Sequence, residues 1–166
     1  MPQVPIQERL SSVRLLLLDG PMGRQLARRG VSIDAVDWSA GALLSSPETI
    51  AEIHPDYVSA GAELVTANTF RTTERSLGKV GGGCRAGDLT RFAVEMTKQE
   101  VSGDVWVAGS QALLEDRYRP DLKPSEGELE REHMQMAEYL ADAGVDVILA
   151  ETHPTIREAV AVARAA

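Results

Sequence analysis

The sequence is poor in cysteine and in long apolar runs, and each shortage excludes a class of protein. The single cysteine, Cys84, excludes a framework of internal disulfide bonds and fits a reducing compartment. No apolar run approaches the length of a membrane span, and the opening residues, MPQVPIQERLSS, lack the apolar core of a signal peptide. We therefore expect a cytoplasmic protein with no membrane partner.

Basic residues are also outnumbered, because 17 Lys and Arg stand against 25 Asp and Glu, for a formal net charge of -8. This surplus argues against nucleic acid or an anionic membrane surface as the main partner, since both are negatively charged themselves. The 166 residues, 43% of them hydrophobic, suffice for one domain with a core, and no linker marks a second domain. The expected partner is a small molecule or another protein.

Four short apolar segments have the composition of buried strands. Each stops at a polar or small residue, as expected of a strand that is covered on both faces. They are VRLLLL (13–18), ELVTA (63–67), DVWVA (104–108) and VDVILA (145–150).

Segments with helical spacing of apolar residues separate these strands. Ser46 and Pro47 mark the start of the first helix and Pro55 should bend it, while Ser125 and Glu128 form a capping box for the third. The predicted ranges are 46–60, about 88–101, 125–143, and 154 or 155 to the end. The predicted buried stripes include Leu89, Phe92, Ala93 and Met96 in the second helix, and Ile156, Val160 and Ala163 in the last. Four strand-helix repeats predict an α/β fold with a parallel sheet.

Ligands of parallel α/β proteins gather beyond the carboxyl ends of the strands. Two carboxylates, Asp19 and Glu151, are expected at that edge, where a pair of acids suits an ammonium group or a general acid/base role. Taken singly, such an Asp also serves as a turn former and such a Glu as a helix cap. The four strand ends read Asp19-Gly20, Asn68-Thr69-Phe70, Gly109-Ser110 and Glu151-Thr152.

Four blocks of the sequence, in this order and spacing, resemble the homocysteine S-methyltransferase family. The resemblance extends from Leu15 to Ala166. The blocks are LLLLDGPMGRQLARRG, SSPETIAEIHPDYVSAGAELVTANTFRTT, DVWVAGSQALLEDRYRP and MAEYLADAGVDVILAET.

The resemblance implies a (β/α)8 TIM-barrel type of fold, with residues 1–166 forming a single partial domain. This domain would be the N-terminal half of the barrel, about four β/α units, because a complete barrel takes about 250 residues. The implied reaction transfers a methyl group to the thiol of homocysteine, or to a related thiol or selenol. The donor stays open among S-methylmethionine, S-adenosylmethionine, betaine and a folate.

The resemblance also assigns substrate-binding roles to residues of this sequence. Asp19 and Glu151 match the residues that hold the amino group of the acceptor, and the loop from Gly20 to Gly23 matches the one whose amides receive its carboxylate. Other matching positions would line the same pocket; these are Met22, Asn68, Thr69 and Ser110.

The family uses zinc, held by three cysteines, to lower the pKa of the acceptor thiol. Those cysteines lie beyond the fourth helix of the family pattern, so no zinc ligands and no independent catalysis are expected of this chain. We expect a fragment of a longer product, or a half that closes its barrel with a C-terminal half or a second copy. The alternative is a non-catalytic half-barrel that binds an amino acid or assembles with a partner chain.

The remaining chemistry-bearing residues give weaker signals. His54, His133 and His153 do not form a metal set by their spacing; the first two are expected to be surface or packing residues, and His153 could reach the substrate. VGGGCRAG (80–87) lies too far from a strand end for a phosphate loop, and Cys84 lacks the second cysteine of the family's zinc motif. This stretch is expected to be a glycine hinge near the substrate.

Overall fold

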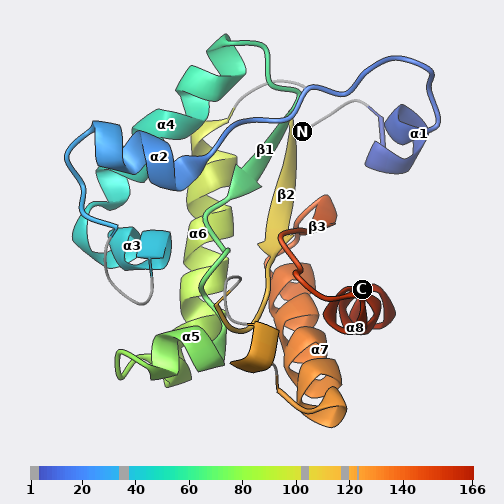
Figure 1. Cartoon of the computed structure of the whole chain (residues 1–166). Helices are drawn as coiled ribbons and strands as arrows, with labels where there is room; N and C mark the ends of the chain where they lie inside the picture. Colours follow the sequence, from blue (N-terminus) through green and yellow to red (C-terminus); the bar gives the residue numbers. More distant parts are fainter. Residues whose placement is uncertain (1–3, 34–37, 102–104, 117–119, 123) are drawn as a thin grey trace.

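The core of the fold is a three-stranded parallel sheet in a computed structural model that describes residues 4–33, 38–101, 105–116, 120–122 and 124–166. The strands are β1 (Leu64–Ala67), β2 (Trp106–Gln111) and β3 (Val147–Ala150), in the order β1-β2-β3. In Figure 1 they run side by side in one direction, so their carboxyl ends share one edge of the sheet. The prediction of a parallel α/β sheet is confirmed for these three strands.

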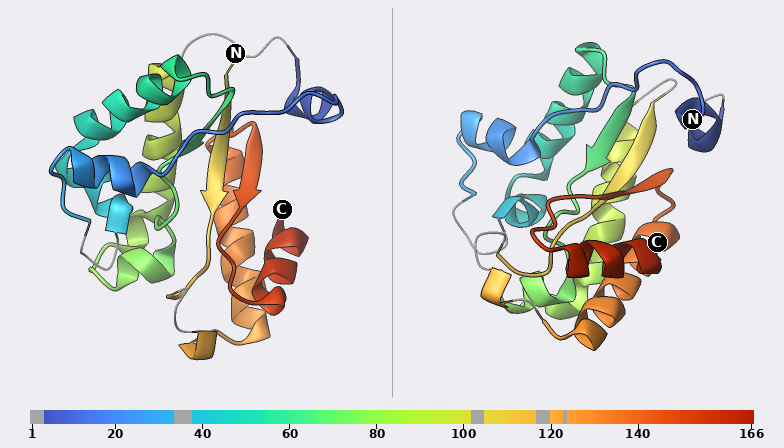
Figure 2. Two further views of the ribbon diagram at one scale, coloured as in Figure 1. Left: turned by 45° about the horizontal axis from the view of Figure 1, so that its top comes forward. Right: turned by 45° about the vertical axis from the view of Figure 1, so that its right-hand side comes forward.

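Helices α6 and α7 lie along one face of the sheet, α4 packs beside α6, and α8 lies beside α7 (Figures 1 and 2). No helix within the described ranges is long and apolar enough to span a membrane. The α-helices are α1 (Ile6–Leu10), α2 (Met22–Arg28), α3 (Ala42–Ser45), α4 (Pro47–Ser59), α5 (Glu74–Gly78), α6 (Ala86–Glu100), α7 (Glu126–Asp142) and α8 (Ile156–Ala165). Short 3-10 turns are η1 (Trp38–Gly41), η2 (Gly83–Arg85) and η3 (Pro120–Leu122).

The two faces of the sheet have different coverings, as the alternation of side chains along a strand requires. On one face, Ala67 of β1 and Val107 of β2 pack with Val94 of α6 in a buried cluster. On the other face, Leu64 and Trp106 pack with Ile6 of the short helix α1, which Figure 1 shows on the side away from α4. This second face also carries the polar residues at the strand ends.

The sequence predicts that residues 13–18 form a strand buried on both faces, and this prediction is wrong. It forms one isolated parallel bridge, Leu18 to Leu64, and Val13 and Leu15 are 104% and 93% exposed. β3 is likewise partly exposed along its length. The physical reason is position: both segments lie at the edges of the described sheet, where a continuous apolar run finds no second layer to cover it.

The helix predictions are confirmed in position but not in every buried stripe. The capping box of α7 is present, since the Ser125 amide donates to Glu128 Oε2 at 2.9 Å and the Glu128 amide donates to Ser125 Oγ. Ser46 precedes α4 as expected, yet its side chain makes no capping hydrogen bond.

Two predicted stripes are wrong in part. Phe92 of α6 is 41% exposed, although Leu89, Ala93 and Met96 on the same helix are buried. In α8, the predicted core residues Ile156, Val160 and Ala163 are exposed, and Glu158, Ala161 and Val162 are buried instead. Helix α8 packs on α7, so the face turned to α7 is buried and the more apolar face is left in solvent.

We predict that replacing glycine by alanine lowers the free energy of unfolding at position 109 and raises it at position 127. A Cβ at Gly109 would lie 2.5 Å from Leu140 Cδ2 in the core, so Gly109→Ala should lower the free energy of unfolding by about 1–3 kcal/mol. Gly127, in the first turn of α7, has no atom within 4 Å of that position, so Gly127→Ala should raise it by up to about 1 kcal/mol. Urea denaturation measures both; equal effects would contradict the packing described.

Candidate active site

A cavity of about 400 Å³ opens at the carboxyl ends of the strands. Its volume lies in the range of small-molecule sites, about 300–1,000 Å³. Its lining comes from the segment after Leu18, the η1 turn and the ends of all three strands. Of the residues predicted for substrate binding, the lining includes Asp19, Gly20, Met22, Gly23, Asn68, Ser110 and Glu151, but not Thr69.

Asp19 is held against β1 by Thr66, a residue that the sequence analysis missed. Its carboxylate accepts the Thr66 amide at 2.8 Å and the Thr66 hydroxyl at 2.9 Å. Burial raises the pKa of Asp19 from the usual 3.8 to about 6; the two bonds from Thr66 oppose this rise, and the charge of Glu151 adds to it. Asp19 and Glu151 are therefore close enough to influence each other.

Glu151 is held in a similar way by hydroxyl groups at neighbouring strand ends. Ser110 Oγ donates to Glu151 Oε1 at 2.6 Å, and Thr152 Oγ1 donates to Oε2 at 3.3 Å. Ser110 lies in β2 rather than after it, because the strand extends to Gln111. The two carboxylates are thus brought to one cavity, each fixed by a hydroxyl of an adjacent strand.

Gly20 and Gly23 allow aromatic rings to pack closely against the backbone after Asp19; the predicted loop 20–23 is partly helical, because Met22 and Gly23 begin α2. A Cβ at Gly20 would lie 2.8 Å from the Tyr57 ring, and a Cβ at Gly23 would lie 3.0 Å from the Trp38 ring. Both distances are shorter than ordinary contacts, so a larger residue would displace a ring. The loop has glycine at these positions because the rings occupy the space.

Asn68 and Thr69 use their polar groups to hold the walls of the cavity. Asn68 Nδ2 donates to the backbone oxygen of Ser39 at 2.7 Å, which fixes the η1 turn beside β1. Thr69 Oγ1 donates to the backbone oxygen of Ser110 at 3.0 Å, and its side chain is fully buried outside the lining. The cavity wall itself includes Trp38 and Phe70, whose rings form an edge-to-face pair with centroids 5.3 Å apart.

Backbone strain is concentrated at this cavity. Among the described residues other than glycine, positive φ angles occur at Trp38 (48°) and Thr152 (63°), and both residues line the cavity. A β-branched residue such as threonine rarely adopts this conformation. Strain of this kind often accompanies functional sites, because the surrounding contacts must maintain it.

Other residues singled out from the sequence lie elsewhere. His54 is fully buried, contacts Thr97 Oγ1 at 3.1 Å, and has its pKa lowered to about 4 by burial, so it is a neutral packing residue. His133 is also fully buried in α7, and His153 is not in the cavity lining. Cys84 is exposed.

The stretch 80–87 is partly helical rather than a simple loop. It contains η2 and the start of α6, and none of its residues lines the cavity. The expectation that it lies over a substrate is therefore not met in this structure. In the charged stretch 115–119, Glu115 forms ion pairs with Arg75 and Lys79, none of which lines the cavity, and 117–119 lie outside the described residues.

The fold and the cavity together define a parallel α/β protein with a ligand site at the carboxyl edge of its sheet. Comparison with known proteins gives the family: residues 16–166 match the family model for homocysteine S-methyltransferases. The chain belongs to the homocysteine S-methyltransferase family. The resemblance seen in the sequence is thereby confirmed.

The relatives show how much of such a protein the chain contains. It is 31% identical over 180 residues to homocysteine S-methyltransferase YbgG of Bacillus subtilis, covering 96% of this chain and 57% of the relative. It is 33% identical over 175 residues to homocysteine S-methyltransferase of Escherichia coli, covering 96% and 56%. The crystal structure of the E. coli homocysteine methyltransferase MmuM in its metallated form matches with a TM-score of 0.84 at 30% identity, covering 98% of this chain and 62% of that one. The chain thus spans about half the length of the curated relatives it matches.

The cavity described here does not fit a thiolate-bound metal ion. Cys84 is the only cysteine of the sequence and is exposed in η2, and the cavity lining within the described residues includes neither cysteine nor histidine. The metal implied by the metallated MmuM structure therefore has no matching ligands in this cavity.

We predict that the carboxyl group of Asp19 titrates near pH 6. Thr66→Val should raise its pKa further, because the variant removes a hydroxyl that stabilises the ionised form. Carboxyl ¹³C NMR over pH 3–8 measures this pKa. Thr97→Val, which removes a buried hydroxyl bonded to Ala93 and His54, is the control and should leave it unchanged. An Asp19 pKa near 4 would contradict the described burial.

Proposed function

We propose that this chain forms the acceptor-binding part of a homocysteine S-methyltransferase, in which Asp19 and Glu151 bind the ammonium group of homocysteine. The observation that carries the proposal is the meeting of these two carboxylates in one cavity at the carboxyl ends of the strands. Two partly buried negative charges repel each other, and a cation between them removes the repulsion and replaces lost hydration.

The rest of the cavity suits the remaining parts of an amino-acid thiol. The loop from Gly20 to Gly23 lies beside Asp19, where its backbone amides can receive the acceptor carboxylate. Met22, Trp38 and Phe70 supply an apolar wall for the methylene chain and the sulfur. In this assignment Ser110 orients Glu151, while Asn68 and Thr69 support the walls of the pocket rather than bind the substrate through their donor groups.

The proposed fold is the N-terminal half of a (β/α)8 barrel, with residues 1–166 as one partial domain. The sheet, the helix layer on one face and the likeness to MmuM support this assignment. The exposed leucines of 13–18 and the exposed face of α8 are apolar surfaces that further barrel units would cover.

The chain's own residues have a binding role in the proposed reaction. In this reaction the S–CH₃ bond forms as the bond between the methyl group and its donor breaks. The demethylated donor leaves with that electron pair, and the thiol proton passes to water. Asp19 and Glu151 hold the acceptor by its ammonium group, and the strained residues Trp38 and Thr152 shape the wall. Zinc, in the proposed complete enzyme, would lower the pKa of the thiol from outside the residues described here.

Glu151→Gln should weaken L-homocysteine binding by about tenfold or more, because it replaces a charge-assisted hydrogen bond to the ammonium group with a neutral one. The side chain keeps its size and its contact with Ser110. Isothermal titration calorimetry measures the dissociation constant. Glu126→Gln, a matched change in the exposed first turn of α7, should leave it unchanged. Equal affinity in all three proteins would refute the assignment.

Binding of L-homocysteine should also weaken as the pH falls below about 6. The raised pKa means that Asp19 takes up a proton in that range, and the neutral acid no longer attracts the ammonium group. The dissociation constant should rise by up to about tenfold per pH unit, and Asp19→Asn should remove this dependence between pH 5 and 7. A pH-dependent affinity that persists in Asp19→Asn would show that another group is responsible.

A further inference from the structure

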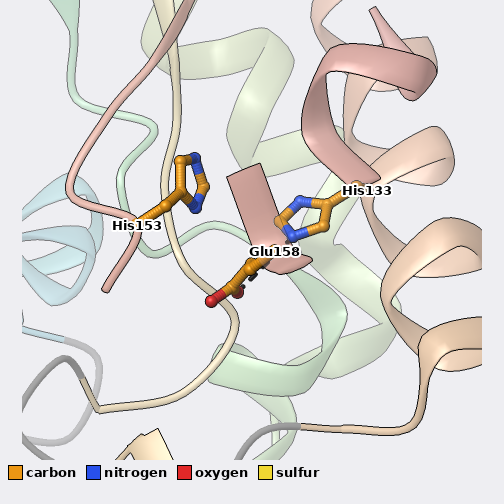
Figure 3. Close-up of side chains that lie close together, drawn as sticks. All are labelled: His133, His153 and Glu158. Carbon is orange, nitrogen blue, oxygen red and sulfur yellow. Dashed lines mark ion pairs between the residues drawn. The ribbon is translucent and has the colours of Figure 1, made fainter. Parts of the chain in front are cut away.

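Two histidines and a glutamate from separate elements meet outside the cavity described above. His133 belongs to α7, His153 to the loop between β3 and α8, and Glu158 to α8. One nitrogen of each ring and one carboxylate oxygen all lie within 4.8 Å of one another. Figure 3 shows both rings close to the Glu158 carboxylate. His133 and Glu158 are fully buried, and His153 is partly exposed, which leaves the cluster accessible from one side.

The spacing of His133 and Glu158 is that of two ligands on one ion. His133 Nε2 lies 3.5 Å from Glu158 Oε1, beyond the usual 2.7–3.2 Å of a hydrogen bond. Two ligand atoms bound tetrahedrally at about 2.0–2.1 Å from zinc are about 3.3–3.4 Å apart. The buried His133 Nε2 also makes no hydrogen bond within the described chain, so it points toward Glu158 without a close partner.

The protonation of His153 suits a metal ligand. Its Nε2 lies 3.1 Å from the backbone oxygen of Gln111, and since a carbonyl oxygen can only accept, Nε2 must carry the proton. In the neutral ring the lone pair is then on Nδ1. A hydrogen bond from the second ring nitrogen to a carbonyl is the usual way in which proteins orient a metal-binding histidine.

Gln111 supplies a similar support for His133. Its side-chain nitrogen donates to the backbone oxygen of His133 at 2.8 Å and lies 3.4 Å from His133 Nδ1. Its Oε1 is buried and makes no hydrogen bond in the described part of the chain. When Nε2 binds a metal, the proton of the neutral ring resides on Nδ1, and Gln111 continues to hold the His133 backbone through its side-chain nitrogen. Glu158 is fixed as well, because its Oε1 accepts the Leu114 amide at 2.8 Å.

We propose that His133 Nε2, His153 Nδ1 and the Glu158 carboxylate bind one divalent transition-metal ion, with zinc as the reference case. Two imidazole nitrogens and one carboxylate oxygen are a donor set that zinc accepts. The wider separations, up to 4.8 Å, close by movement of the partly exposed His153. The ion would tie α8 and the loop after Glu151 to α7. This geometry reverses the sequence-based expectation that the histidines do not form a metal set.

The test is equilibrium dialysis of the metal-stripped 166-residue chain against Zn²⁺. We expect one equivalent of zinc per chain, and an affinity at least tenfold lower in both His153→Gln and Glu158→Gln. Far-UV circular dichroism checks that each variant is folded. His153→Gln alone decides the result if the buried Glu158 variant does not fold, because His153 lies partly exposed in a loop.

A matched control removes the single thiol of the sequence, which is another strong zinc ligand. Cys84→Ser changes an exposed thiol far along the chain from the cluster and should leave the affinity unchanged. Co²⁺ gives a second readout, since its visible absorption bands should appear in the parent chain and disappear in His153→Gln. The proposal is overturned if the chain retains no stoichiometric zinc, if both ligand variants bind it as well as the parent, or if Cys84→Ser abolishes binding. None of these results depends on methyl transfer or homocysteine binding.

Discussion

The pair of hydrogen bonds between Asp19 and Thr66 is the contact on which the site depends. Residues 13–18 form one isolated bridge to β1, and the Glu63 and Leu64 amides both donate to the backbone oxygen of Leu17, so backbone pairing with β1 is confined to the end of this segment. The Asp19 carboxylate adds two bonds, to the amide and the hydroxyl of Thr66, at the carboxyl end of the strand. These bonds place the loop from Gly20 to Gly23 over the sheet and put one negative charge into the cavity.

The same arrangement recurs on the other side of the cavity, where the Ser110 hydroxyl binds Glu151. Strand hydroxyls thus orient both carboxylates, while the backbone of the sheet stays paired. The design has an electrostatic cost, visible in the raised pKa of Asp19, because burial and a second acid disfavour its charge. A cationic group bound between the two carboxylates would relieve their repulsion. This is the basis for assigning the site to the ammonium group of the acceptor.

Sequence patterns predicted the parallel sheet, the order of its elements and most of the cavity. Polar residues at strand ends could be read directly, because parallel strands bring their carboxyl ends to one edge. Thr66 was missed since it lies inside an apolar run, although its position two residues before Asn68 is the alternate position that faces the same side of the sheet as Leu64. The place of Trp38 in the cavity wall could not be predicted, because its packing on Gly23 is a tertiary contact.

The wrong predictions of buried residues have a common cause, because local sequence does not encode which apolar surfaces another element covers. Val13 and Leu15 have strand composition, and Ile156 and Val160 have helical spacing, yet their exposure depends on whether another layer covers them. The histidine cluster shows the converse, because His133 and Glu158 are 25 positions apart and meet only when α8 packs on α7. Contacts between elements, rather than the elements themselves, were the part that sequence reasoning could not supply.

The most direct test of the central claim is a crystal structure of the chain with L-homocysteine. The account predicts the ammonium nitrogen within hydrogen-bond distance of both Asp19 and Glu151, with the carboxylate at the loop from Gly20 to Gly23. An acceptor bound elsewhere, or with its ammonium group away from these two carboxylates, would contradict it.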